Sequence, residues 1–103
     1  MKEPGDRNLV VRAGLGRWPI TTAAGDELAR DALPLSERLL DALADWAEFY
    51  DDVGGEITDV DVAHEFVGQG FKIAHALRRE LKGSRVHLEH PVTGELAPIG
   101  SRR

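Results

Sequence analysis

The chain contains 103 residues, 42% of them hydrophobic, with no cysteine and a formal net charge of −5 at pH 7. A chain of this length supports one hydrophobic core, so we expect residues 1–103 to form a single domain with frayed ends at 1–7 and 100–103. The absence of cysteine excludes disulfides, thiolate metal sites and thiol nucleophiles. Because no signal-peptide h-region and no run of about 18 apolar residues is present, we expect a cytoplasmic protein without a membrane partner.

The charge is distributed unevenly along the sequence. Residues 26–65 hold thirteen acidic side chains against Arg30 and Arg38, a local balance of −11, whereas residues 1–25 sum to +2 and residues 66–103 to +4. Proteins that bind nucleic acid need a basic surface to meet the phosphates. The acidic middle of the chain therefore argues against nucleic acid as a general partner.

The N-terminal third contains strand and turn signals. The β-branched segment Asn8–Arg12 predicts a short strand, and the Gly- and Pro-containing segment 14–20 predicts a turn that returns to a strand near Trp18. The segment that follows has room for one helical turn around residues 26–31, which Pro34 prevents from continuing.

A first helix is predicted from Ser36 to residue 52. The Ser36 hydroxyl is a good N-cap, and the loop signal Gly54-Gly55 marks the end. One side of this helix is apolar, formed by Leu39, Leu40, Leu43, Trp46, Ala47 and Tyr50.

The opposite side of the same helix carries an acidic stripe. Its members, spaced three or four residues apart, are Glu37, Asp41, Asp45, Glu48 and Asp52. Like charges four residues apart cost a helix about 0.2–0.5 kcal/mol per pair, and acids at a helix C-terminus also oppose the macrodipole. The stripe is either a solvated face that aids solubility or a docking surface, and its local cost at the C-terminal end of the helix is a reason to consider the second interpretation.

A second, longer helix is predicted from Thr58 to about residue 82, with Asp61 in the capping-box position and Gly83 just after its end. Glycine in the middle of a helix costs up to about 1 kcal/mol relative to alanine. We therefore expect Gly68 and Gly70 to mark close packing of another element, with the aromatic group Trp46, Phe49 and Tyr50 as its neighbour.

The C-terminal part alternates in hydrophobicity over Arg85–His90, which predicts a half-buried strand. The turn residues 91–94 then lead into Glu95–Ala97, which predicts a hairpin. The predicted fold class is α+β, with two main helices packed on a small, mostly antiparallel sheet formed by the N-terminal strand and the C-terminal hairpin.

The histidines supply no complete metal site. His64 and His75 lie on one face of the second helix but about 16 Å apart along its axis. His87 and Glu89 share one face of the predicted strand, and we expect them to form an exposed ion pair. Neither pattern brings three ligands together, so we predict no metal and no cofactor.

Two aromatic residues fall outside the main apolar stripes. Most of the aromatic residues occupy helical core positions, but Phe49 and Phe71 do not. If both rings are exposed together, they mark a binding or dimer surface.

The chain resembles short uncharacterised proteins of high-GC Gram-positive bacteria over about residues 15–96. The resemblance rests on core and cap positions: Trp18-Pro19, Leu33-Pro34-Leu35-Ser36, Trp46, Tyr50-Asp51, Gly70, Ala74, Leu77, Leu81 and Val86–Glu89. Some similar small acidic proteins act as immunity proteins to secreted toxins. The resemblance implies an immunity-like role but carries over no catalytic residues.

We therefore expect a non-enzymatic interaction protein that docks a basic protein partner on the acidic stripe. A second hypothesis is a small enzyme or ligand-binding module with a pocket near Arg85, His87 and Glu89. A third is an architectural homodimer in which the long second helix pairs with its symmetry mate.

Overall fold

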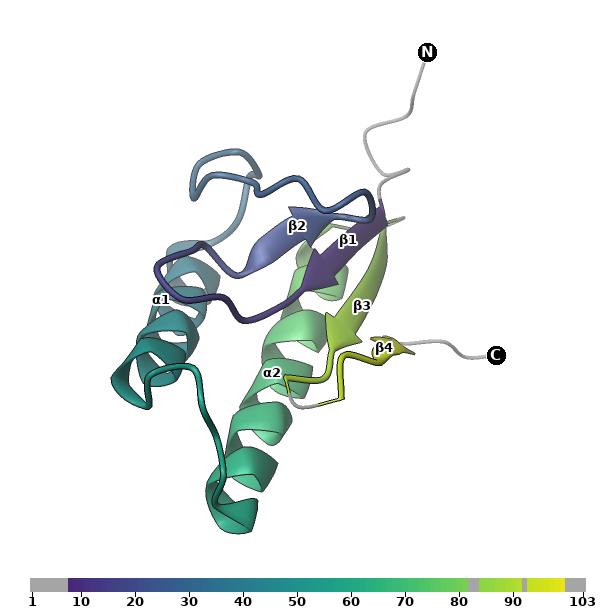
Figure 1. The fold of residues 1–103 in the computed structure, drawn as a ribbon. Coiled ribbons are helices and arrows are strands. Elements are labelled where there is room, and N and C mark those ends of the chain that lie inside the picture. Colours follow the sequence, from purple (N-terminus) through teal and green to yellow (C-terminus); the bar gives the residue numbers. More distant parts are fainter. Residues whose placement is uncertain (1–7, 82–83, 92, 100–103) are drawn as a thin grey trace.

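The computed structural model describes residues 8–81, 84–91 and 93–99. Along the chain the elements are β1 (Asn8–Val11), β2 (Ile20–Thr22), α1 (Glu37–Asp52), α2 (Val60–Glu80), β3 (Arg85–Glu89) and β4 (Leu96–Pro98) (Figure 1). This confirms the predicted α+β class with two main helices. The predicted fraying of 1–7 and 100–103 and the predicted cap at Gly83 concern residues outside the described ranges.

The four strands form one sheet in the order β2-β1-β3-β4. β1 is antiparallel to β2 and β3 is antiparallel to β4, so the sheet is mostly antiparallel, as predicted. The two halves join through a parallel pair, β1 with β3, in which Leu9 lies opposite Val86 and Val11 opposite Leu88. Consecutive burial along β1, on both faces of the sheet, suits this central position.

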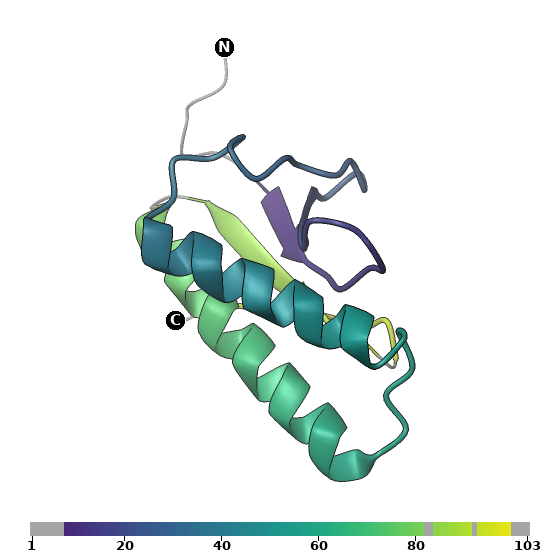
Figure 2. The same ribbon diagram turned by 90° about the vertical axis from the view of Figure 1, so that its left-hand side faces the viewer.

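Both helices lie on the same side of the sheet. α1 and α2 run side by side, and α2 packs directly against β3 (Figures 1 and 2). Between the helices, the Trp46 ring stacks on the Phe66 ring with centroids 4.5 Å apart, and Trp46 Nε1 donates a hydrogen bond of 2.9 Å to the Phe66 carbonyl. The indole therefore fills the helix interface without leaving its buried N–H unpaired.

The close approach of α1 and the sheet to α2 depends on Gly70. A Cβ atom at this position would lie 2.9 Å from Trp46 Cζ2 and 3.2 Å from Leu88 Cδ1. The predicted packing at Gly70 is therefore confirmed, with Trp46 as the neighbour. For Gly68 the same prediction is wrong, because this residue is exposed and a Cβ there would meet nothing within 4 Å.

The helix starts agree with the sequence to within one residue. The Ser36 hydroxyl accepts a hydrogen bond from the Leu39 N–H (3.2 Å), as predicted for the cap of α1. α2 is capped by Asp59 and not by Thr58, because one Asp59 carboxylate oxygen accepts the N–H groups of Asp61 and Val62 at 2.8 and 3.2 Å. A charged carboxylate is a stronger acceptor for these donors than a hydroxyl.

The segment between β2 and α1 differs from the prediction. No helical turn forms at residues 26–31, because the chain first continues alongside β2 through a bridge between Thr21 and Glu27. The Leu28 N–H donates to the Ile20 carbonyl at 3.0 Å. These backbone groups are thus used across the sheet edge and are not available for a local helix.

Candidate functional site

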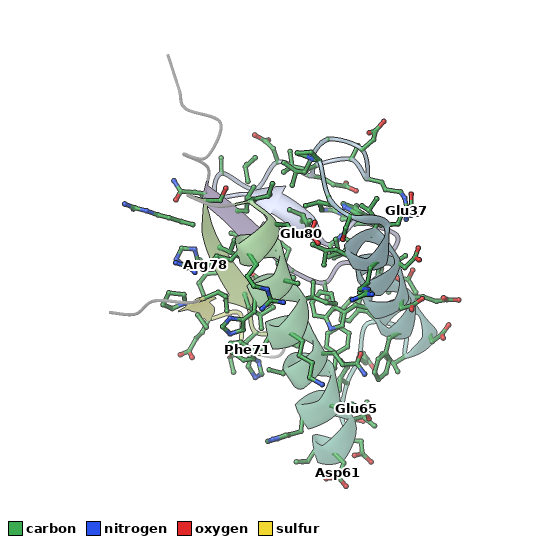
Figure 3. All side chains as sticks on the ribbon, turned by 180° about the vertical axis from the view of Figure 1, so that it is seen from behind. Glu37, Asp61, Glu65, Phe71, Arg78 and Glu80 are labelled. Carbon is green, nitrogen blue, oxygen red and sulfur yellow. The ribbon has the colours of Figure 1, made fainter. Side chains whose placement is uncertain are left out.

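The acidic stripe lies on the exposed side of α1. All five of its carboxylates are on exposed residues, opposite the buried Leu39, Leu43 and Trp46. Acidic side chains extend from α1 on the side away from α2 (Figure 3). The 100° periodicity of the helix produces this separation, because acidic and apolar residues alternate at helical spacing.

Among the described residues, most carboxylates of the stripe have no ion-pair partner. Within the described ranges, Asp41 alone among the five forms an ion pair, with 3.8 Å between its Oδ1 and Arg30 Nη2, and both side chains are largely exposed at 72% and 48%. Such exposed pairs contribute at most about 1 kcal/mol. Asp51, which lies beside the stripe, accepts a hydrogen bond of 3.0 Å from the Gly16 N–H through its Oδ1. This bond connects the β1–β2 loop to α1.

Phe49 and Phe71 do not form one exposed pair. Phe49 is half-buried and packs edge-to-face on Phe66, with centroids 5.3 Å apart and an interplanar angle of 88°. Phe71 is 36% exposed and lies on a different side of α2, about 140° around the helix from Phe66. The two rings therefore belong to different surfaces, and only Phe71 contributes to an open one.

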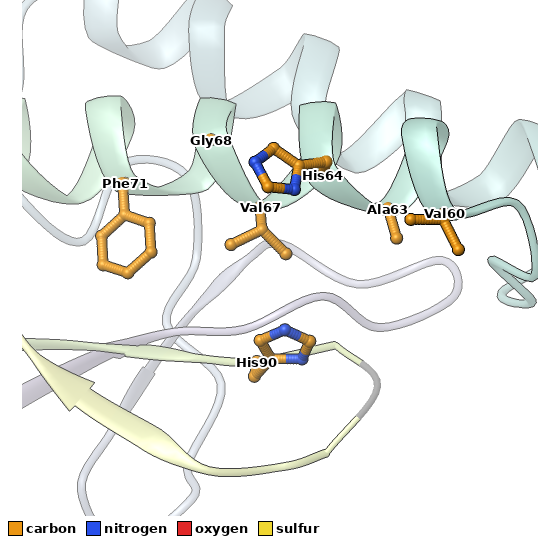
Figure 4. A pocket seen from close by; sticks show the side chains of 7 residues that line it. All are labelled: Val60, Ala63, His64, Val67, Gly68, Phe71 and His90. Carbon is orange, nitrogen blue, oxygen red and sulfur yellow. The ribbon is translucent and has the colours of Figure 1, made fainter.

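Phe71 lines an open hollow of about 460 Å³ between α2 and the β3–β4 turn (Figure 4). The α2 side is mainly apolar and includes Val60, which is 78% exposed. His64 from α2 and His90 from the turn face one another across it (Figure 4). The lining residues of this Phe71 hollow are Val60, Ala63, His64, Val67, Gly68, Phe71 and His90.

A second hollow, of about 540 Å³, lies between the two helices, and we name it the α1–α2 groove. Its residues are Ser36, Arg38, Leu39, Ala42, Lys72, Ile73, Ala76, Arg79 and Glu80. Glu80 lies where the end of α2 meets the start of α1 (Figure 3), and its carboxylate accepts the Ser36 N–H at 2.7 Å and the Ser36 hydroxyl at 2.5 Å. No pattern in the sequence of either helix indicated this groove.

The third hollow, of about 360 Å³, lies beside the β1–β2 loop and includes Arg12, Arg17, Trp18 and Tyr50. Arg12 Nη1 is 3.8 Å from Glu89 Oε2. Glu89 thus pairs with Arg12, and the predicted ion pair with His87 is not among the contacts of the described residues. The proposed pocket near Arg85, His87 and Glu89 coincides with none of these three hollows.

In the part of the chain that the structure describes, no three His, Asp or Glu side chains gather closely enough to hold a metal ion. No helix in the same ranges has the length and apolar character needed to cross a membrane.

These features define a small α+β protein whose most distinctive surface is an acidic helix face. Residues 7–89 match the model of the family described as Serratia CdiI immunity protein-like. Since this match covers most of the chain, the protein belongs to that family. The matched range includes β1, β2, α1, α2 and β3, and hence the whole acidic stripe. A search of curated proteins found no match.

Proposed function

We propose that this protein is a non-enzymatic immunity protein that binds a basic toxin through the acidic stripe, centred on Asp41, Asp45, Glu48 and Asp52. The observation that carries the proposal is the exposure of the stripe on α1 with a single ion pair among its members in the described residues. The family description supports an immunity role, and immunity proteins act by binding a protein partner.

The physical basis is electrostatic complementarity. Carboxylates spaced by single helical turns repel one another, and a basic surface opposite them relieves this repulsion. A concentrated field of one sign also raises the association rate with a partner of opposite sign, most strongly at low ionic strength. The stripe thus steers the encounter and sets the orientation of the bound partner.

Affinity capture from the native host, followed by mass spectrometry, identifies the partner for kinetic measurements. The test variant combines Asp41→Asn, Asp45→Asn, Glu48→Gln and Asp52→Asn. We expect its association rate constant at low salt to fall by about tenfold or more, with a weaker dependence on salt than the wild type. Surface plasmon resonance at two salt concentrations measures both quantities.

A matched control removes four exposed acids from other parts of the protein: Asp26→Asn, Asp31→Asn, Glu56→Gln and Glu95→Gln. It changes the net charge equally, so it separates the stripe from overall charge. Circular dichroism checks that both variants are folded. An association rate that is the same at low and high salt, or equal losses in the two variants, contradicts the proposal.

A further inference from the structure

We propose that the α1–α2 groove is a second contact site for the same partner and takes an apolar side chain flanked by carboxylates. This inference rests on the proposed function for the identity of the occupant. The chemistry of the occupant follows from the groove itself, which combines an apolar floor with a cationic rim.

The floor of the groove is apolar and lined by small residues. Leu39 from α1 and Ile73 from α2 are buried beneath it, whereas Ala42 and Ala76 are half-buried at its surface. Alanine side chains leave space between the helix backbones where larger residues would fill it. A volume of about 540 Å³ is sufficient for an apolar side chain with its neighbours.

The rim of the groove carries three cations. Arg38 comes from α1, and Lys72 and Arg79 come from α2, and all three are exposed. None of them forms an ion pair with another described residue. The single carboxylate of the groove, Glu80, already accepts two hydrogen bonds from Ser36. The groove is therefore locally positive in a protein of net charge −5, and it favours an anionic group.

The groove borders the acidic stripe. On the α1 helix, Arg38 is about 20° from Asp45 around the axis, and Ala42 follows at about 40° further towards α2. A partner that covers the stripe reaches the groove within the width of one helix, about 10 Å. The stripe is negative and the rim of the groove is positive, so a partner with a basic patch beside an acidic patch matches both surfaces in only one orientation. The groove therefore fixes how the partner docks.

The chemistry is tested first with 8-anilinonaphthalene-1-sulfonate, which joins aromatic rings to one anionic group. We expect its fluorescence to rise on binding and the amide NMR signals of Ala42, Ile73 and Ala76 to shift. The triple variant Arg38→Gln, Lys72→Gln and Arg79→Gln should bind the probe at least tenfold more weakly. A control with equal charge change, Arg17→Gln, Arg78→Gln and Arg85→Gln, should change the dissociation constant less than twofold.

Thermal unfolding of each variant excludes probe binding to partly unfolded protein. Shifts confined to the Phe71 hollow or to the hollow beside Arg12 overturn the inference. Probe binding that is weakened equally in the triple variant and in its control also overturns the inference.

The identified partner then tests the occupant. We expect the triple variant to raise the dissociation rate constant of the complex at least tenfold without lowering the association rate constant, whereas the stripe variant lowers the association rate constant. An unchanged dissociation rate in the triple variant, together with slower association in the stripe variant, overturns the groove contact and leaves the proposed function intact. Unchanged binding in the stripe variant contradicts the proposed function instead.

Discussion

At the scale of single residues, Gly68 and Gly70 show how two identical signals in one helix acquire different meanings. Both glycines interrupt α2, where glycine is less favourable than alanine. Gly70 lies four residues after Phe66 and seven before Leu77, which places it on the buried side of the helix. Gly68 falls outside that phase and is exposed. Helical phase in the sequence was thus sufficient to separate them.

Alanine at these two positions should change stability in opposite directions. Gly70→Ala places a methyl group against the rigid ring of the buried Trp46, and we expect it to lower the free energy of unfolding by about 1–3 kcal/mol, with Gly70→Leu lowering it further. Gly68→Ala meets no atom and should raise the free energy of unfolding by about 0.5–1 kcal/mol through helix propensity. Urea unfolding monitored by circular dichroism measures both. A Gly70→Ala variant that is as stable as the wild type, or more stable, would argue against the Gly70 contact.

At the scale of helices and strands, periodicity predicted the course of α1 and its two sides, because the acids and the apolar residues recur at helical spacing. It did not predict the α1–α2 groove. Lys72 and Arg79 share a side of α2 in the sequence, but they line one groove with Arg38 only because of how the two helices pack against each other. The stacking of Trp46 on Phe66 is one of the contacts that join the two helices, and the pattern of either helix alone does not contain it.

The start of α2 gives a prediction at the same scale, because two adjacent residues both have good capping chemistry. Asp59 accepts two backbone N–H groups, so Asp59→Ala should lower the free energy of unfolding by about 1 kcal/mol. Thr58→Ala serves as the matched control and should change it by less than about 0.5 kcal/mol. Chemical denaturation compares the two variants with the wild type. A larger loss for Thr58→Ala would indicate that Thr58, and not Asp59, caps α2.

At the scale of the whole molecule, the sequence predicted which segments form the sheet but not how its two halves join. The sequence predicts the N-terminal strand beside the C-terminal hairpin, and β1 does lie next to β3. The relative direction of β1 and β3 depends on the intervening path through β2 and both helices, which local patterns do not determine. The three consecutive apolar residues 9–11 were the available signal that β1 is a central strand, covered on both faces.

The charge distribution predicts that salt has opposite effects on stability and on binding. In the isolated protein, the stripe carboxylates follow one another at three- and four-residue spacing on α1, and within the described residues only Asp41 has an ion-pair partner. Screening their repulsion from low salt to about 0.5 M NaCl should therefore raise the melting temperature. The same screening should slow association with a basic partner. The stripe variant should show a higher melting temperature at low salt and a smaller rise with salt, because its neighbouring charges are gone.

Thermal unfolding at both salt concentrations, with the four-acid control variant beside the stripe variant, separates neighbour repulsion from net charge. The control has the same net charge as the stripe variant but keeps all five carboxylates of the stripe, so its melting temperature should still rise with salt as the wild type does. A wild-type melting temperature that falls with salt would mean that attraction between the acidic helix and the basic flanks outweighs repulsion within the stripe. In that case the stripe would stabilise the isolated fold, and its cost would no longer be a reason to infer a partner.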